Sequence, residues 1–348
     1  AAAPATSHGY AASYSETRRS HGFRAANMLG EGQASLGYTW FGPIFGDTFT
    51  PTGMGVGGRY GHIGENNKAF TMDRAYFTYH YQHNAVPVSL SGAPFVNHSI
   101  NKYVFGAEKS FANGLASVEV RGEMLNDVDA FGADTAFDTG IFGNTTVNLK
   151  LQLYEGENFG LVGGVGMGAP TGSDFDAYLT TTGTSFSVDN RAYYVLPFIG
   201  ATYAPTESLF GTTFVQVATA ASGDRLLVDD VVVGKVTSQT TIHVSTSIGA
   251  WIIDEDDGYG IKGLAWLNEF HYTTALQDPD NVLAFGPFGE TINVASSGSR
   301  YSLLHVTSGV HLQLSELMSF RVAGVFPIRD GGDRTYDAQV LATFNKEF

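Results

Sequence analysis

The stretch that most constrains the fold is 336–348, where apolar and polar side chains alternate. Its apolar members are Tyr336, Ala338, Val340, Ala342, Phe344 and Phe348, and its polar members are Asp337, Gln339, Thr343 and Asn345. A period of two residues is typical of a β-strand with one apolar and one polar face. A transmembrane β-barrel closes its last strand against its first and carries aromatic residues at the membrane interfaces. We therefore expect this stretch to close such a barrel, with the terminal strand of a soluble sandwich as the alternative.

The composition favours a barrel over an α/β enzyme. Charged residues make up 15% of the 348 residues, against about 25% in an ordinary globular domain. The chain contains 43 Gly, 25 Phe and 17 Tyr but no Cys, so it has no disulfide framework. It has no apolar run of the length that a transmembrane helix needs. Any membrane crossing is therefore expected to be made by strands.

Strand-like patterns recur along the chain from residue 70 onward, and we count twelve of them. Each covers the roughly 9–11 residues that a tilted strand needs to cross the hydrocarbon layer. The predicted strands are 70–82, 100–111, 115–125, 142–154, 158–168, 190–203, 208–220, 241–253, 258–273, 300–314, 316–328 and 336–348.

The connections between these strands alternate between short and long. The short ones are 112–114, 155–157, 204–207, 254–257 and residue 315, whereas the long ones are 83–99, 126–141, 169–189, 221–240, 274–299 and 329–335. Up-and-down barrels of outer membranes have short periplasmic turns and long outer loops. The predicted fold is therefore an all-β, antiparallel, up-and-down transmembrane barrel of twelve strands with an irregular N-terminal extension.

We divide the chain into this extension, residues 1–69, and the barrel, residues 70–348. The extension is rich in Gly and aromatic residues and has no sustained period. It is expected either to plug the barrel or to form a periplasmic or assembly arm. The chain starts with Ala1, Ala2, Ala3, Pro4 and Ala5, which is typical of a mature N-terminus after signal-peptide removal. The expected location is the bacterial outer membrane.

Strand alternation also predicts which side chains face inward. A Lys or Arg that faces lipid at the bilayer midplane costs about 2–4 kcal/mol, so the charged members of each strand should face the lumen. The predicted pore-lining residues are Glu119, Arg121, Glu123, Lys150, His243, Glu269, His271, His305, His311 and Arg321. Acid–base pairs that only fill the barrel are the alternative to a polar path for solutes.

Three functional hypotheses follow. The first is a porin-like channel for small solutes, and the second is a structural barrel that forms oligomers or a surface lattice. The third is an outer-membrane hydrolase, because His243 and Ser245 form a His-x-Ser pair of the kind that the outer-membrane phospholipase uses. Ile242 and Val244 take the lipid side of that strand, which turns the pair away from a lipid substrate. We therefore expect no enzyme and no catalytic residues.

The acidic balance bears on partners and ions. Lys and Arg number 19 against 34 Asp and Glu, a net charge of −15, which argues against nucleic acid. Outer-membrane lipid and lipopolysaccharide are the expected partners, and a homo-oligomer is left open. No cofactor or metal site is predicted, but acidic loops could hold divalent cations such as Ca²⁺ or Mg²⁺ loosely. The candidate loop residues are Asp127, Asp129, Asp134 and Asp138, whose pattern departs from an EF-hand.

Three stretches resemble a family. Residues 58–81 (GRYGHIGENNKAFTMDRAYFTYHY) resemble the first strand region of outer-membrane β-barrel proteins of planctomycete bacteria, and residues 105–121 (FGAEKSFANGLASVEVR) are similar to their following hairpin. Residues 163–172 (GGVGMGAPTG) resemble a Gly-rich strand of the related MetA-pathway, transporter-like barrels. The resemblance implies a barrel but brings little function with it.

Overall fold

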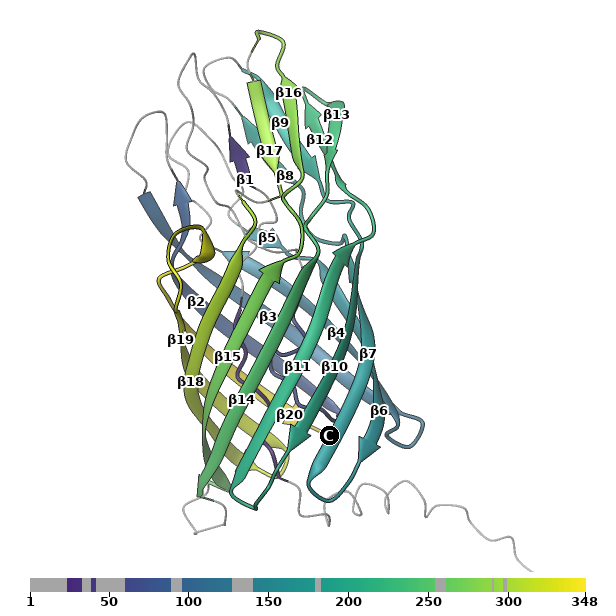
Figure 1. Ribbon diagram of the computed structural model, residues 1–348, viewed down its shortest axis with the longest axis vertical. Helices are drawn as coiled ribbons and strands as arrows, with labels where there is room; N and C mark the ends of the chain where they lie inside the picture. The colour runs from purple at the N-terminus through teal and green to yellow at the C-terminus, as the bar shows by residue number, and fades with distance from the viewer. Residues whose placement is uncertain are drawn as a thin grey trace, which may run out of the picture.

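A computed structural model of the chain describes residues 24–32, 39–41, 60–88, 96–126, 140–178, 183–253, 261–289, 291–296 and 299–348. Figure 1 shows a tilted barrel with a crown of shorter strands at the end opposite the C-terminus. We call the end that holds the C-terminus the turn end, and the opposite end the crown end. In the described part of the chain, no helix has the length and apolar character required to cross a membrane.

The largest sheet has thirteen strands. Twelve of them close into an antiparallel barrel, because β3 pairs with both β2 and β4, whereas β5 (Gly140–Phe142) pairs only with the end of β4. The barrel strands are β2 (Arg74–Val88), β3 (Val96–Phe111), β4 (Ala116–Asn126), β6 (Thr145–Glu155), β7 (Phe159–Ala169), β10 (Tyr194–Tyr203), β11 (Leu209–Ala220), β14 (Thr241–Ile253), β15 (Gly263–Ala275), β18 (Ser302–Ser315), β19 (Met318–Pro327) and β20 (Ala338–Glu347).

The predicted strand number and closure are confirmed. Each of the twelve predicted stretches overlaps one barrel strand. The first strand, β2, pairs antiparallel with the last, β20, and the register sets Phe77 opposite Phe344 and Thr78 opposite Thr343. Because the pleat alternates sides, this register keeps both Phe residues on one face and both Thr residues on the other.

Several predicted strand boundaries differ from the structure by a few residues, and two of these differences concern the strands that close the barrel. The first strand begins at Arg74 instead of residue 70, because the backbone N–H groups of Thr71 and Met72 donate to Gln152 and Glu108 inside the barrel. The last strand begins at Ala338 instead of Tyr336. The Tyr336 ring, placed on the apolar outer face by the pattern, is buried and stacks on His305 with centroids 5.1 Å apart.

Tight turns join strands at the turn end. Between β3 and β4, Ala112, Asn113 and Gly114 all have positive φ, at 50°, 56° and 81°. Asn and Gly accept this left-handed region best. Ser315 is the last residue of β18 and not the connection itself, so the turn to β19 consists of residues 316 and 317.

The long connections contain strands of their own, which the sequence pattern missed. Three of these connections, together with β1 from the N-terminal extension, build a four-stranded and a three-stranded sheet at the crown end (Figure 1). The first sheet consists of β8 (Phe175–Tyr178), β9 (Ser185–Asp189), β12 (Asp224–Val228) and β13 (Val231–Val236), and the second of β1 (Thr39–Phe41), β17 (Thr291–Ala295) and β16 (Asn281–Phe285). A short 3₁₀ turn, η1 (Gly331–Asp333), precedes β20. We call the two sheets together the crown.

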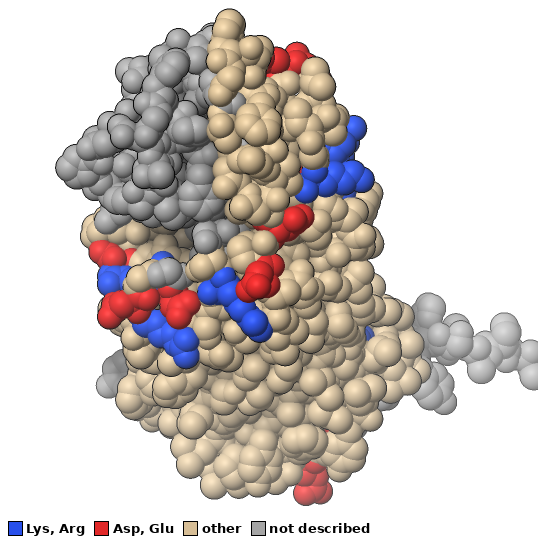
Figure 2. All heavy atoms as spheres, turned by 45° about the horizontal axis from the view of Figure 1, so that its top comes forward, with Lys and Arg blue, Asp and Glu red and all other residues tan. Residues whose placement is uncertain are grey.

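The outer wall of the barrel is apolar. Ile248, Phe105 and Phe270 point outward, and these residues are 64%, 57% and 53% exposed. Figure 2 shows Lys, Arg, Asp and Glu gathered where the barrel meets the crown, while the wall beyond is largely free of them. A hydrocarbon layer favours such a surface, because unpaired charges at its centre are costly.

The inner face of β7 is lined by glycine. Its inward positions include Gly160, Gly164 and Gly168, and a Cβ built there would come within 2.4 Å of Phe70, 2.5 Å of Phe198 and 3.2 Å of Tyr194. The missing side chains leave room for large rings inside the barrel. Space within the lumen therefore explains Gly164 and Gly168 of the Gly-rich stretch 163–172.

Candidate functional site

Residues 24–32 and 60–73, which we call the inner segments, pass through the barrel interior. Arg24 lies at the turn end, where its Nη2 donates to Lys262 O at 3.0 Å. β1 then pairs with β17 in the crown. Tyr60 lies at the crown end of β14, 2.9 Å from Thr241 Oγ1, and Thr71 Oγ1 reaches Gly114 O in the β3–β4 turn at 2.6 Å. The chain therefore passes through the lumen toward the crown and back before β2 begins.

The first inner segment is held through its backbone. Glu269 on β15 accepts hydrogen bonds from Leu29 N at 2.6 Å and Gly30 N at 2.8 Å. Arg321 on β19 donates from Nη1 to Met28 O at 2.7 Å and Asn27 O at 3.2 Å. A buried carboxylate and a buried guanidinium thus bind the donors and the acceptors of adjacent peptide groups. Hydrogen bonds to charged groups are among the stronger ones in proteins.

Further hydrogen bonds hold the part of the first inner segment that lies nearer the crown. Thr307 Oγ1 donates to Gly30 O at 3.3 Å. His305 Nδ1 bonds the Glu31 carboxylate, and Gln82 Nε2 donates to Gly32 O. Gly30 has φ of +90°, and a Cβ there would lie 2.8 Å from the backbone of Glu65. Glycine is required at this position because other residues would suffer both strain and a clash.

The second inner segment is fixed by side chains of the wall. Three backbone N–H groups, those of Gly61, Ile63 and Ala69, donate to Thr146 at 3.0 Å, Gln216 at 3.1 Å and Thr202 at 2.9 Å. These acceptors come from β6, β11 and β10. The segment has no regular secondary structure, so polar side chains of the wall satisfy N–H groups that a buried loop would otherwise leave unpaired.

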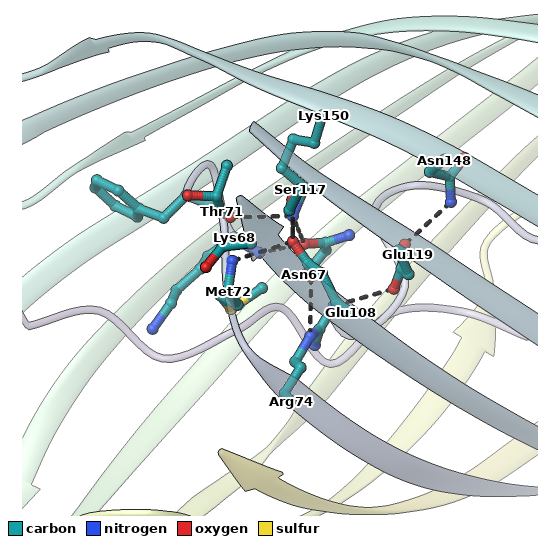
Figure 3. A network of polar contacts seen from close by, with 12 residues as sticks. Asn67, Lys68, Thr71, Met72, Arg74, Glu108, Ser117, Glu119, Asn148 and Lys150 are labelled. Carbon is teal, nitrogen blue, oxygen red and sulfur yellow. Dashed lines mark hydrogen bonds and ion pairs between the residues drawn. The ribbon is translucent and has the colours of Figure 1, made fainter. Parts of the chain in front are cut away.

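An ion-pair network lies toward the turn end (Figure 3). Glu108 sits 3.1 Å from Arg74 Nε and 2.9 Å from Lys150 Nζ. Lys150 Nζ also donates to Asn67 Oδ1 at 2.8 Å and to Phe70 O at 3.0 Å. The Lys150 and Glu108 side chains are at most 1% exposed. The same charges therefore bind strands to one another and to the second inner segment.

Glu119 connects this network to a second group of charges. It accepts hydrogen bonds from Tyr76 at 2.8 Å, Asn148 at 3.0 Å and Arg121 at 2.8 Å. Arg121 also donates to His62 O at 2.7 Å. Buried charges are stable only where partners replace water, and Glu119 has such a set.

All ten predicted pore-lining residues lie inside the barrel. Their partners, besides those already given, include Lys102 for Glu123 at 2.8 Å and Gln313 for His311 at 3.0 Å. The inner segments occupy the space that these side chains surround. Whether the residues line a path for solutes stays a prediction.

The predicted set of pore-lining residues did not include several members of the ion-pair network, among them Arg74 and Glu108. These two lie opposite each other in the β2–β3 register. Glu108 could have been identified by the same alternation that predicted Glu119. Glu31 and Glu65 could not, since they lie in segments without a period.

His243 and Ser245, the pair behind the hydrolase hypothesis, are not bonded to each other in the structure. His243 bonds Tyr60, Thr241 and Thr273, at 3.0, 2.8 and 2.8 Å. Ser245 instead bonds His271 Nδ1 at 3.0 Å, and Glu269 lies 3.1 Å from His271 Nε2. A Cβ built on Gly64 would be 2.9 Å from Ser245 Oγ. The second inner segment thus covers Ser245, which faces the barrel interior and not the apolar outer wall.

The candidate cation ligands Asp127, Asp129, Asp134 and Asp138 lie outside the described residues. Among those that the structure describes, no three His, Asp or Glu side chains are placed to hold a metal ion. A cavity of about 10 Å³ lies beside Leu29, Glu65, Tyr76 and Arg121. That is the space of about one water molecule, so the interior around it is closely packed.

A closed twelve-stranded barrel with an apolar outer wall and a polar interior defines a transmembrane β-barrel of the outer-membrane type. No family model and no curated protein matches the sequence. Solved outer-membrane barrels match its fold. An outer-membrane channel from Pseudomonas putida F1 aligns over 81% of this chain and 97% of its own, with a TM-score of 0.51 and 10% identity.

Two porins align over 79% of this chain with lower scores. The NanC porin is covered to 98%, with a TM-score of 0.46 and 6% identity. The KdgM porin, solved in complex with disordered oligogalacturonate, is covered to 99%, with a TM-score of 0.41 and 8% identity. At such identities the likeness concerns the fold alone. The outer-membrane barrel part of the family resemblance is supported, and its planctomycete part stays a prediction.

Proposed function

We propose that this chain is a porin-like channel for small solutes in the bacterial outer membrane, closed in the present state by its inner segments. The observation that carries the proposal is how the lumen is filled. Wall residues such as Glu269, Arg321 and Lys150 bind the inner segments through hydrogen bonds and ion pairs. If the inner segments move out of the lumen, water can form hydrogen bonds with the wall side chains that the segments leave. The pore that opens would then have a polar lining.

If the inner segments served only to stabilise the barrel, the inner wall would not need to be polar and charged. Apolar packing of similar volume is often as stable as a buried ion pair or more so. The charged residues around the first inner segment therefore favour a lumen that is at times hydrated. The location rests on the apolar outer wall and on the fold shared with the Pseudomonas putida channel.

Conductance in planar bilayers tests the proposal. The variant Gly30→Pro removes the N–H that donates to Glu269, and proline cannot adopt the φ of +90° found there. We expect the full-length variant to open far more often than the wild type. A folded variant that conducts no ions would overturn the channel proposal.

A reversible lock provides the matched control. A Cβ at position 168 would lie 3.4 Å from the Cβ of Tyr60, near the spacing of about 3.8 Å in disulfides. The chain has no Cys, so the double variant Tyr60→Cys, Gly168→Cys forms a single bond. Combined with Gly30→Pro, it should reduce conductance when oxidised and regain it with reductant. Each single Cys variant should be insensitive to reductant.

A second candidate function is structural, namely oligomers or a lattice held through the crown. Apolar side chains of β13 and β16 are exposed there, including Val231 at 64% and Phe285 at 66%. Scattered apolar side chains are common on surfaces, whereas a gathered set marks a contact. Divalent cations at the acidic loops would support the same assembly. Sedimentation of the purified protein with and without EDTA tests it, and a monomer under both conditions would argue against a lattice.

A further inference from the structure

We infer that the wall around residues 27–31 is a binding site for short peptides, which the chain's own segment occupies in the closed state. The inference rests on the proposed channel function and names a solute class for it. The wall residues are Glu269, His305, Thr307 and Arg321, which come from the neighbouring strands β15, β18 and β19.

The contacts recognise a peptide backbone. Two consecutive carbonyls, of Asn27 and Met28, bind Arg321, and the next two N–H groups, of Leu29 and Gly30, bind Glu269. Thr307 binds the following carbonyl, that of Gly30. A sugar or a hydrocarbon lacks this order of acceptors and donors. A peptide of any sequence has it.

One contact adds a preference for an acidic side chain. The Glu31 carboxylate bonds His305, whose ring is held by stacking on Tyr336. The four wall side chains are all buried, and Glu269 and His305 are fully so. A solute that fills the site must therefore replace hydrogen bonds as well as volume, since a buried charge left without partners is costly. A peptide with an acidic residue meets both demands.

Glu269 and Arg321 also have few other partners to hold them. The hydrogen bonds that Arg321 donates go to residues 27, 28 and 66, all in the inner segments. Glu269 contacts His271 besides its two backbone donors. Glu108 and Glu119 pair with Arg and Lys side chains of the wall, whereas Glu269 and Arg321 bind the N–H and carbonyl groups of the first inner segment.

Flux into proteoliposomes tests the inference, using the full-length Gly30→Pro variant, in which we expect the segment to leave the site. The probe is the capped pentapeptide Asn-Met-Leu-Gly-Glu, which has the same sequence as residues 27–31. Its control carries methyl groups on the Leu and Gly nitrogens and so lacks the two donors to Glu269. A trisaccharide of similar mass reports the general permeability of the pore.

We expect the pentapeptide to enter roughly tenfold faster than the methylated peptide at low concentration, because two hydrogen bonds to a carboxylate are lost. Adding Glu269→Gln should reduce this ratio severalfold, whereas Glu207→Gln in the exposed β10–β11 turn should leave it unchanged. Equal entry of both peptides overturns the inference while the channel proposal stands. Absence of flux for all three solutes overturns the inference, and absence of ion conductance in the same folded variant overturns the channel proposal as well.

Discussion

Arg74 Nη2 lies 3.1 Å from Glu119 Oε1, although their strands, β2 and β4, are separated in the barrel by β3. The pair therefore spans the inner face of the intervening strand. Both side chains are almost fully buried, so neither charge has water as an alternative partner. The interaction joins the first strand of the barrel to its third without a backbone hydrogen bond.

Replacing Glu119 should destabilise the barrel strongly. Glu119→Ala removes the acceptor of Arg74, Tyr76 and Arg121. Breaking a buried ion pair by removing one partner costs about 3–5 kcal/mol. Urea unfolding in lipid vesicles should show this loss, and Glu207→Ala in an exposed turn should change stability by less than about 0.5 kcal/mol. Similar unfolding curves for the two variants would contradict a structural role for the network.

A side chain added to the inner face of β7 should displace an inner segment. In Gly160→Leu, the new Cβ would meet the Phe70 ring at 2.4 Å, and residues 69–72 must shift. We expect a higher conductance from a barrel that still folds. Gly163 lies on the same strand but its Cβ would face Leu153 at 3.0 Å, on the outer side. Gly163→Leu should therefore leave conductance at the wild-type level, and equal conductance in both variants would refute the role of Phe70.

A charge on the outer wall should hinder insertion. Ile248 is near the middle of β14 and is 64% exposed. Ile248→Arg should lower stability in a bilayer by about 2–4 kcal/mol, the cost of Arg near the midplane. Glu207→Arg, in the exposed β10–β11 turn, should have little effect. The heat-stable fraction on gels after refolding into vesicles measures both, and full recovery of Ile248→Arg would argue that this face does not contact lipid.

Asp73 should make the barrel seam sensitive to acid. Partial burial raises the pKa of this carboxyl, but hydrogen bonds from Ser110 and the nearby Lys109 lower it by more, so the net pKa lies below the ordinary value of an Asp carboxyl. A carboxyl with a lowered pKa contributes stability that is present above its ordinary pKa and lost as the pH falls through the folded value.

The matched variant is Asp73→Asn, which keeps the size of the side chain. At neutral pH it should unfold at lower urea concentration than the wild type, and the difference should shrink as the pH falls below about 4. Ser110→Ala, which removes one of the donors to Asp73, should give a smaller change in the same direction. A difference that is constant from neutral to acid pH would show that the Asp73 charge is not the cause.

Much of the architecture could be predicted from the chain itself. The alternation at 336–348, the Asn113 and Gly114 turn and the short and long connections each reflect local constraints. One face of every strand meets lipid and the other a polar interior, which imposes a period of two on the sequence. The same rule placed Glu119, Lys150 and Arg321 inside, because an ionised side chain is excluded from the outer wall.

The alternation could not decide whether the N-terminal extension plugs the barrel or forms an arm outside it. Arg321 and Asn27 lie 294 positions apart, and they meet only because β2 closes on β20 and the inner segments pass through the lumen. Residues 27–31 carry no period, and their backbone groups could have bound water, another strand or a partner. The alternation of polar and apolar residues arises because each strand has lipid on one face and a polar interior on the other. This alternation is what made the barrel fold predictable from the sequence. The tertiary structure brings distant residues together through barrel closure and strand register. It thereby places the N-terminal segments against the polar inner wall of the barrel.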